Sequence, residues 1–297
     1  MRTVFEWSLG KRSLQLGKRT LIMGVLNVTP DSFSDGGLYV EQGRAVEHGL
    51  RLLDEGADII DVGGESTRPG AMVRIPGDGA AQKALTDEEE LERVIPVIRS
   101  LKQKRVNAVI SVDTYKAPVA QQAVEAGAEI VNDVSGFRWD PHMIRTLSAL
   151  KCGAVMMHMR GRPEEWKALP PVADALMLVK RELREWVDHA VTKGVKRETI
   201  VLDPGFGFGK NLEQNYPLLK RLDELHGLRY PLLVAVSRKS FIGRALARNG
   251  TDAPLEDRLL GTIAAETAMI MKGAHIIRTH DVRACADAAR IADIVVS

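Results

Sequence analysis

The stretch TDEEELERVIPVIRSLKQKRVNAVISVD, residues 86–113, joins a helix with a marked start to a short apolar strand, and this pairing decides the class of fold. Thr86 followed by Glu89 forms a capping box, which predicts that a helix begins here. The apolar face expected for that helix consists of Leu91, Val94, Ile95, Ile98 and Leu101. The run NAVISV (107–112) is apolar without alternation, so we expect a strand buried on both faces, as in a parallel sheet covered by helices.

The strand-and-helix pattern repeats along the whole chain. Apolar runs of strand length occur at 21–26, 58–62, 107–112, 129–133, 153–158, 199–203, 232–237 and 275–279. Helical spacing is clear for Leu176, Val179, Leu183, Trp186, Val187 and Ala190, and for Leu259, Leu260, Ile263, Thr267 and Met271. These units predict an α/β fold, a (β/α)8 TIM barrel, with a doubly wound open sheet as the alternative. The runs VFEWSL and SLQLGK within residues 1–20 predict a short β-hairpin that covers the N-terminal mouth of the barrel.

Composition excludes several classes of protein. Residues 1–297 have no Pro/Gly/Ser-rich linker, so we expect a single domain. Lys and Arg number 41 against 39 Asp and Glu, a balance that argues against a nucleic-acid groove. No apolar stretch is long enough for a membrane span. Cys152 and Cys285 lie in apolar or helical segments, which favours buried thiols and a cytoplasmic protein.

Polar side chains follow every predicted strand. In a barrel the C-terminal ends of the strands converge on one mouth, so these side chains should meet. They are Asn27, Asp61, Glu65, Asp113, Asn132, Asp133, His158, Asp203, Ser237, Arg238, Lys239, Arg278 and His280. A single Asp at such a position is often only a helix N-cap. Arg238, Lys239 and Arg278 cannot serve that role, because a cation opposes the helix dipole, and we therefore expect them to face an anion.

Two of the predicted loops are long and rich in glycine and hydroxyl groups. NVTPDSFSDGG (27–37) and GGESTRPGA (63–71) have the length of binding loops, and the second continues as a polar segment to about residue 85, where a surface insertion is the alternative. DPGFGFGK (203–210) matches neither a Walker A loop nor GxGxxG. Its glycines permit close approach to a flat ligand, with Phe206 or Phe208 available to pack on it.

Three of the strand-end residues suit a flat heterocycle. Asp113, Asn132 and Asp203 offer acceptors and one amide for the donor edge of an amino-pyrimidinone, although a buried Asp paired with Arg or Lys is the alternative.

Another group suits a phosphate chain. Arg278 and His280 share one strand face and can bind a di- or triphosphate, and Asn27 can share a Mg²⁺ with it. Neither HExxH nor GxSxG occurs, which disfavours metal-dependent hydrolysis and a serine nucleophile.

Eight motifs occur in a fixed order that resembles the dihydropteroate synthase family. They are NVTPDSFSDGG, DVGGESTRPGA, SVDTYK, NDVSG, MHMRG, DPGFGFGK, SRKSFIG and RTHDV, and they span about residues 20–282. The resemblance implies a pterin-binding TIM barrel that joins 6-hydroxymethyl-7,8-dihydropterin diphosphate to p-aminobenzoate and releases pyrophosphate with Mg²⁺. It also implies a homodimer, through late helices such as that with Leu259, Ile263 and Met271, and sensitivity to sulfonamides.

The resemblance also implies roles for individual residues. The pterin would be bound by Asp113, Asn132, Asp203 and Lys239, and the diphosphate by Asn27, Arg278 and His280, with Asn27 also at the metal. The p-aminobenzoate pocket would contain Phe33, Thr67, Arg68, Pro69, Phe208 and Ser240, and catalysis would involve Asp35, Arg68 and Lys239. Residues 72–85 form a longer segment than is usual in the family. The alternatives are a methyltetrahydrofolate-binding methyltransferase barrel, a non-catalytic pterin-binding paralogue, and an unrelated phosphate-binding barrel.

Overall fold

The structure is a computed structural model that describes residues 2–29, 38–65, 70–73 and 84–296. An antiparallel hairpin, β1 (Phe5–Ser8) and β2 (Ser13–Leu16), precedes eight parallel strands. These strands are β3 (Leu21–Asn27), β4 (Ile59–Gly63), β5 (Val109–Asp113), β6 (Ile130–Asp133), β7 (Gly153–Met157), β8 (Ile200–Asp203), β9 (Leu233–Val234) and β10 (Ile276–Thr279). All eight predicted strands are confirmed, although the one expected at 232–237 keeps only two residues of ladder.

The parallel strands form a nearly closed barrel. Their order is β8-β7-β6-β5-β4-β3-β10-β9, so each strand lies beside its neighbour in the chain except at β3 and β10, which bring the two ends of the series together. The remaining seam, between β8 and β9, is joined by a parallel bridge between Leu202 and Leu232. The amide of Leu202 also donates to the carbonyl of Pro231 at 3.0 Å. The prediction of a (β/α)8 barrel is therefore confirmed, and the open sheet is not observed.

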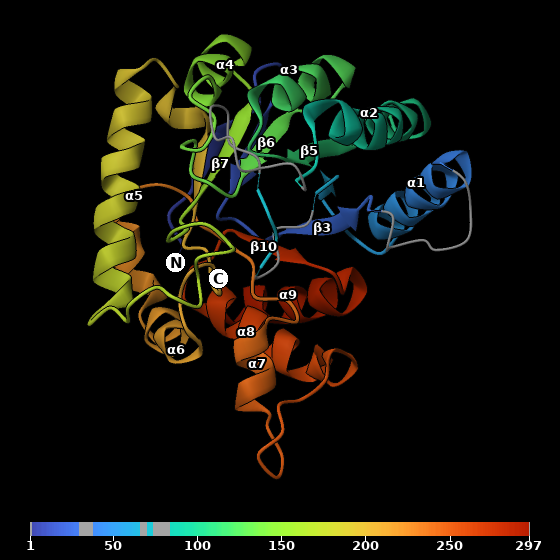
Figure 1. Cartoon of the computed structure of the whole chain (residues 1–297). Coiled ribbons are helices and arrows are strands. Elements are labelled where there is room, and N and C mark those ends of the chain that lie inside the picture. Colours follow the sequence, from blue (N-terminus) through green and yellow to red (C-terminus); the bar gives the residue numbers. More distant parts are fainter. Residues whose placement is uncertain (1, 30–37, 66–69, 74–83, 297) are drawn as a thin grey trace.

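Helices surround the barrel in chain order (Figure 1). They are α1 (Leu38–Asp54), α2 (Asp87–Lys104), α3 (Ala117–Ala126), α4 (Met143–Leu150), α5 (Ala175–Thr192), α6 (Leu212–Lys220), α7 (Ser240–Ala245), α8 (Leu259–Met271) and α9 (Val282–Val296), with short 3-10 turns η2 (Arg197–Thr199), η3 (Leu222–Leu228) and η4 (Leu255–Arg258). None of the helices that the structure describes has the length and apolar character needed to cross a membrane.

The predicted faces of two helices are confirmed, and that of a third is wrong. Helix α2 begins with the expected capping box at Thr86 and Glu89, and α5 buries its expected apolar stripe. In α8, however, the buried side chains are Thr262, Glu266, Met269 and Ile270. Leu260 on the predicted face is 82% exposed. Helix α8 is apolar nearly all round, so periodicity alone could not select the face that packs on the barrel.

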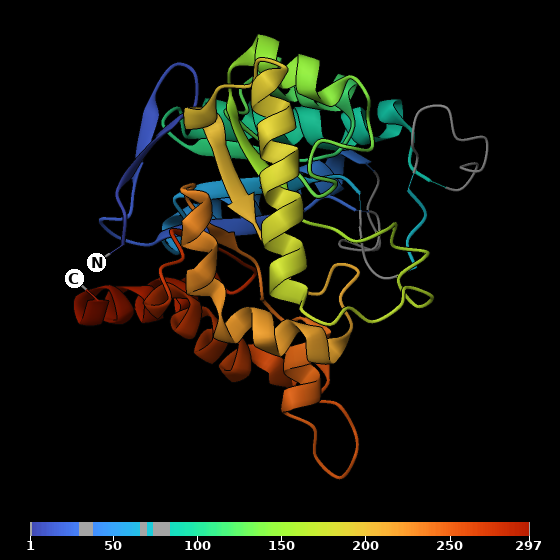
Figure 2. The ribbon, with the colours of Figure 1, turned by 90° about the vertical axis from the view of Figure 1, so that its left-hand side faces the viewer.

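The interior of the barrel is apolar at its N-terminal end. One cluster of buried side chains contains Met23, Ile59, Val109, Ile130, Val155, Val201, Leu233 and Ile276 from the eight strands, together with Trp7, Leu9 and Leu16 of the hairpin segment. The indole Nε1 of Trp7 donates to the carbonyl of Thr199 at 2.7 Å. Figure 2 shows the hairpin at the side of the barrel where both chain termini lie. The hairpin therefore covers the N-terminal mouth as predicted.

Two residues further along most strands, the inward side chains become polar. Side chains alternate along a strand, so the residue two positions after an apolar inward residue also faces inward, one layer nearer the C-terminal mouth. Asp61 follows Ile59, Asn132 follows Ile130, Asp203 follows Val201 and Arg278 follows Ile276. This change from an apolar to a polar layer places the candidate site inside the C-terminal end of the barrel.

Candidate active site

Four strand-end residues form one buried hydrogen-bonded cluster, which we call the mouth cluster: Asp61, Asp113, Asn132 and Arg278. Arg278 donates from Nε to Asp61 Oδ2 at 2.6 Å and from Nη2 to Asp113 Oδ2 at 2.7 Å. Asn132 Nδ2 donates to the same Asp61 oxygen at 2.9 Å. The Asp61 side chain is fully buried, and those of Asp113 and Arg278 are 17% and 18% exposed. Strands β4, β5, β6 and β10 thus meet at one point.

The mouth cluster is short of polar partners. Asp61 Oδ1 is buried and has no hydrogen-bond partner within the described residues. Burial raises the pKa of Asp113 to about 7, although the charge of Arg278 opposes that shift. Burial alone would lower the pKa of Arg278, but the nearby charges of Asp61 and Asp113 outweigh it and raise that pKa. Buried polar groups with unused hydrogen-bonding capacity at a barrel mouth are expected of a binding site.

Lys239 and Asp203 lie beside the mouth cluster. Lys239 Nζ donates to the carbonyl of Phe206 and lies 4.1 Å from the centre of the Phe208 ring. Burial lowers the pKa of Lys239 to about 7, and the charge of Asp203 opposes this shift. Burial raises the pKa of Asp203, against the charge of Lys239, while Asp203 Oδ1 accepts from the amide of Gly205 at 2.7 Å. A cation and an acceptor therefore flank the same space.

The glycines of DPGFGFGK are required by the backbone. Gly205 and Gly209 have φ values of +64° and +65°, and a Cβ on them would lie 1.9 Å from the carbonyl of His158 and 2.1 Å from that of Arg160. The buried Lys210 donates from Nζ to the carbonyl of Gly205 at 2.8 Å, which fixes the turn. The lysine that resembles a phosphate-binding residue is therefore structural.

The two phenylalanines of this turn have different surroundings. Phe206 is fully buried and lies near Phe241, so the expectation that it could pack on a ligand is wrong. Phe208 is only partly buried and contacts Trp166 edge to face, with ring centres 5.5 Å apart. It belongs to an apolar wall of the mouth that also contains Val73, Tyr115, Val134, Trp139, Met157 and Met159.

The residues expected to bind diphosphate lie at the rim. His280 is exposed, and its Nδ1 lies 3.0 Å from Ser237 Oγ. Partial desolvation, and then the charges of Arg278 and Arg238, lower the pKa of His280 to about 4. Arg238 pairs with Asp281, an internal partner that the sequence did not indicate. The expectation that all three cations face a ligand anion is thus wrong for Arg238, and Arg278 already contacts two carboxylates.

Other predicted residues lie apart from the mouth cluster. His158 is buried against α5, where Nε2 lies 3.0 Å from Glu182 Oε2 and the ring stacks on Trp186. Asp133 accepts from the amides of Ser135 and Phe137 in the turn that follows β6, so it has a structural role, although it is not a helix N-cap because α4 begins only at Met143. Ser240 is exposed at the first residue of α7.

Five predicted site residues belong to segments that the structure does not describe. Phe33, Asp35, Thr67, Arg68 and Pro69 all lie outside the described residues, as do 74–83 of the long polar segment.

Asp61 was predicted to lie at the end of its strand but not to belong to the site. The signal was its parity, because it lies two residues after the inward-facing Ile59. A second buried group also received no role: Lys116 Nζ lies 2.7 Å from Glu90 and 2.9 Å from Glu65. This ion-paired group holds the start of the loop after β4 against α2. Glu65 and Lys116 lie more than forty residues apart in the sequence, so no local spacing pattern indicates their ion pair.

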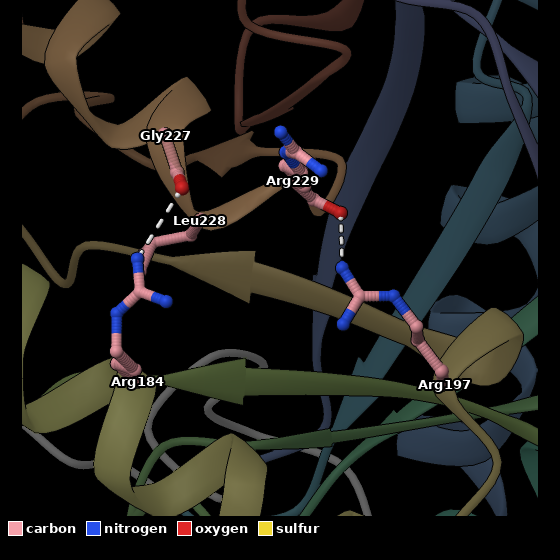
Figure 3. Close-up of a pocket in the computed structure, with 5 residues that line it drawn as sticks. All are labelled: Arg184, Arg197, Gly227, Leu228 and Arg229. Atoms are coloured by element: carbon pink, nitrogen blue, oxygen red, sulfur yellow. Dashed lines mark hydrogen bonds between the residues drawn. The ribbon is translucent and has the colours of Figure 1, made fainter.

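Cavity size alone would direct attention to the opposite end of the barrel. A cavity of about 710 Å³ is lined by Arg184, Arg197, Gly227, Leu228 and Arg229 (Figure 3). Arg197 and Arg229 directly precede β8 and β9, so the cavity lies at the N-terminal ends of the strands. Arg184 donates to the carbonyl of Gly227 and Arg197 to that of Arg229. No carboxylate of the described part of the chain lines this cavity, and we do not take it as the site.

Comparisons with known proteins identify the family. Residues 23–280 match the model of the family described as pterin binding enzyme. The dihydropteroate synthase of Clostridium beijerinckii is 42% identical over 97% of this chain and 98% of its own length. That of Escherichia coli K12 is 42% identical over 93% of this chain and 92% of its own length.

Solved structures give the same result. Xanthomonas albilineans dihydropteroate synthase with 4-aminobenzoic acid superposes with a TM-score of 0.87 at 40% identity, covering 99% of this chain and 98% of that one. The same enzyme in complex with 7,8-dihydropteroate gives a TM-score of 0.82 at 37% identity, with 98% coverage of each chain. By the family match and by these identities over nearly its whole length, this chain belongs to the dihydropteroate synthase family of pterin-binding enzymes.

Proposed function

We propose that the protein joins 6-hydroxymethyl-7,8-dihydropterin diphosphate to p-aminobenzoate, forming 7,8-dihydropteroate and releasing pyrophosphate. The observation that carries this proposal is the mouth cluster, in which two carboxylates hold one arginine inside the barrel and an amide donates to one of those carboxylates. The cluster combines acceptors for a heterocycle with a cation for a departing anion. The polar layer is supported from below by the apolar interior and the hairpin, so its geometry is fixed before substrate arrives.

The pterin would bind to oxygens that the protein leaves unused. Within the described residues, Asp113 accepts a hydrogen bond only at Oδ2, and Asp203 accepts one only at Oδ1. The other oxygen of each carboxylate can therefore accept from a ring N–H or amino group. Asn132 uses its Nδ2 toward Asp61, which leaves its carbonyl oxygen as a third acceptor. Lys239 would donate to the pterin carbonyl from the opposite side.

The diphosphate would lie at the rim, against Arg278, His280 and Asn27. Arg278 uses Nε and Nη2 within the mouth cluster, and its Nη1 makes no hydrogen bond among the described residues. Asn27 Oδ1 and Asp113 Oδ2 both lie close to Gly63, which places Asn27 at the same edge of the mouth. An arginine between two carboxylates is held in place by them, so its free donor is preorganised for phosphate.

We infer that Mg²⁺ would arrive with the diphosphate. Over the described residues, no group of three or more acidic, histidine or cysteine side chains could hold a metal. Mg²⁺ keeps several waters and is often held by one or two protein ligands together with substrate phosphates, a pattern that Asn27 fits as the protein oxygen. When bound, the ion would neutralise charge on the leaving diphosphate.

The p-aminobenzoate would lie between the apolar wall and α7. Phe208 presents a partly exposed ring for the aryl group, and Ser240 is exposed for its carboxylate. Four further residues are assigned to this pocket because they lie in the family motifs: Phe33, Thr67, Arg68 and Pro69. The same pocket would admit sulfonamides, and a Yersinia pestis relative has been solved with a sulfonamide drug.

We propose that the bond between the pterin methylene carbon and the diphosphate oxygen breaks before the new bond forms. An arylamine is a weak nucleophile, so stabilising the departing anion by Arg278 and His280 contributes more than a general base. The electron-rich pterin would delocalise the positive charge, and Asp35 with the buried aspartates would stabilise it. The amine nitrogen then bonds to the methylene carbon and loses a proton. Cleavage that continues when p-aminobenzoate is omitted supports this order, whereas strict dependence on p-aminobenzoate opposes it.

The two alternative functions make different demands on the site. A methyltetrahydrofolate-binding methyltransferase needs the pterin acceptors but neither Lys239 with Ser240 nor Arg278 with His280. A non-catalytic paralogue would bind the pterin without turnover. Pyrophosphate release from purified chain, pterin diphosphate, Mg²⁺ and p-aminobenzoate separates both from the proposed enzyme, with Lys239→Ala as the site variant.

The protein is also proposed to form a homodimer through α8 and α9. The exposed apolar side chains on these helices and the turn before them include Leu255, Leu260, Met271, Ile291, Ile294 and Val295. Patches of this kind on a monomer mark association sites. Sedimentation of Leu260→Glu against wild type tests the interface, and a wild-type monomer would contradict it. We further propose that residues 1–297 act as one domain and that the buried free thiols of Cys152 and Cys285 suit the cytoplasm.

A further inference from the structure

A separate cavity opens at the rim of the mouth, on the side of α1. It has a volume of about 460 Å³ and is lined by Asn27 and His280 on one side and by Arg44, Glu47, His48 and Arg51 of α1 on the other. Asn27 and His280 are the residues to which the proposed function gives the diphosphate. The α1 residues have no role in that function. The cavity therefore continues from the diphosphate position toward solvent.

One histidine of this cavity, His48, is fixed as a hydrogen-bond donor. His280 Nδ1 lies 3.0 Å from Ser237 Oγ, which can both donate and accept and which also accepts from the His280 amide at 3.2 Å. His48 Nδ1 lies 2.6 Å from Arg51 Nη2, and the guanidinium can only donate. In the neutral form the His48 ring then carries its hydrogen on Nε2. This imidazole N–H group and the Asn27 amide can thus serve an anion without a change of protonation.

The charges around the cavity are unevenly paired. Arg44 is exposed and has no ion pair or hydrogen bond among the described residues, whereas Arg51 lies 3.8 Å from Glu55. Among the residues that the structure describes, Glu47 is the one carboxylate that lines the cavity. Burial, and then the charge of Arg51, lower the pKa of His48. The charges of Arg278 and Arg238 contribute to lowering the pKa of His280. Cationic surroundings on both sides favour an anion here.

We propose that this cavity is the release site for pyrophosphate, with Arg44 retaining the product and Glu47 repelling it. The inference rests on the proposed function, because pyrophosphate is the anion that must leave past Asn27 and His280. A cavity with one unpaired cation and one opposing carboxylate is suited to a product that has to depart. A release site must attract the departing anion without binding it tightly. Arg44 would attract the anion, and Glu47 would limit its affinity.

The test measures pyrophosphate binding in the presence of Mg²⁺ by calorimetry, together with product inhibition of turnover. Arg44→Gln is expected to weaken binding and to raise the inhibition constant several-fold, which is the scale of one partly exposed charge contact. Glu47→Gln is expected to shift both quantities in the opposite direction. The kcat/KM for the pterin diphosphate should stay within about twofold of wild type in both variants.

Matched controls remove charge nearby without reaching the cavity. Glu41→Gln changes a carboxylate in the first turn of α1, and Arg105→Gln changes an exposed arginine that contacts Asp54 at the last residue of α1. Neither should alter the affinity for pyrophosphate. Orthophosphate and sulfate serve as comparison anions, and the Arg44 effect should be larger for pyrophosphate.

Several results would overturn the inference. They are unchanged pyrophosphate affinity in Arg44→Gln, changes of the same sign in Arg44→Gln and Glu47→Gln, or equal effects on sulfate and pyrophosphate. Failure of the proposed function is distinguishable, because it would appear as a wild-type protein that releases no pyrophosphate from its substrates. The calorimetric comparison can be made in either case.

Discussion

Arginines line both ends of the barrel, but only one end has the properties of an active site. At the C-terminal end Arg278 is held between Asp61 and Asp113 inside the strands. At the N-terminal end Arg197 is exposed, stacks 3.9 Å from the centre of the Tyr230 ring and donates to a neutral carbonyl (Figure 3). The cavity at the N-terminal end, of about 710 Å³, is larger than the rim cavity of about 460 Å³ beside the mouth, so neither volume nor arginine content identifies the site.

The two ends of the barrel differ in how far their charged groups are buried away from water. Burial in the barrel interior raises the pKa values of Asp113 and Asp203, and hydrogen-bonding capacity remains unused at the mouth. At the other end, Arg184, Arg197 and Arg229 are exposed, and Arg184 and Arg197 donate to neutral backbone carbonyls. The two ends therefore differ because at the mouth a buried polar layer lies above an apolar layer.

The largest expected difference between the ends is in stability. Arg278→Met removes the partner of two buried or partly buried carboxylates and should lower the free energy of unfolding by roughly 3–5 kcal/mol. Arg197→Met removes an exposed group and should lower it by less than about 1 kcal/mol. Urea unfolding of both variants gives the comparison. Equal losses would show that burial of charge does not separate the ends.

The next effect concerns turnover. Lys239→Ala should lower kcat/KM about 10- to 100-fold, because a charge-assisted hydrogen bond to the pterin contributes roughly 1.5–3 kcal/mol. Arg184→Ala, at the cavity of the opposite end, should leave kcat/KM within about twofold. Steady-state pyrophosphate release measures both. A loss in Arg184→Ala as large as that in Lys239→Ala would transfer the functional importance to the N-terminal end.

The pH dependence of kcat/KM should report two groups at the mouth. Activity needs protonated Lys239, whose pKa is lowered to about 7, and is lost as pH rises through that value. It also needs ionised Asp113, whose pKa is raised to about 7, and is lost as pH falls through that value. The profile should be bell-shaped. In Lys239→Arg the alkaline limb should move well above pH 7 while the acidic limb stays, and an unchanged alkaline limb would exclude Lys239 as its source.

The smallest expected effect tests whether a buried acid with a raised pKa is sufficient to mark an active site. Glu266 on α8 is 1% exposed, and burial raises its pKa to about 7, yet it lies outside the mouth cluster. Its folded-state pKa is raised above the unfolded value, so its contribution to stability is complete below about pH 4.5 and is lost as pH rises to about 7. Glu266→Gln should flatten that part of the stability–pH curve and leave kcat/KM unchanged. A drop in kcat/KM would extend the site to α8.

Much of this fold follows from local sequence pattern. Continuous apolar strands require cover on both faces, and the capping box at Thr86 fixes the start of α2, so the order of elements could be predicted. The face of α8 could not, because Leu260 and Met269 are equally apolar and only tertiary packing distinguishes them. The short ladder of β9 likewise depends on closure of the barrel at Leu202 and Leu232.

The candidate site was predictable in its members more than in its contacts. The motifs gave Asp113, Asn132 and Arg278, and strand parity brings their side chains to one layer. That Arg278 is ion-paired with Asp61 is a long-range contact across the barrel, which no local pattern encodes. The expectation that His158 lies at the mouth was wrong for the same reason, because its partner Glu182 lies on α5, which covers the outside of the barrel.

The most direct test is pyrophosphate release by Asp203→Asn compared with wild type. Asparagine keeps an oxygen for the Gly205 amide but replaces the unused oxygen with a donor, so folding should be preserved while pterin binding is lost. The mouth cluster predicts release by wild type with pterin diphosphate, Mg²⁺ and p-aminobenzoate, and at least about a tenfold loss of kcat/KM in the variant. A variant as active as wild type, or a wild type without release, would contradict the assignment of the active site to the C-terminal end of the barrel.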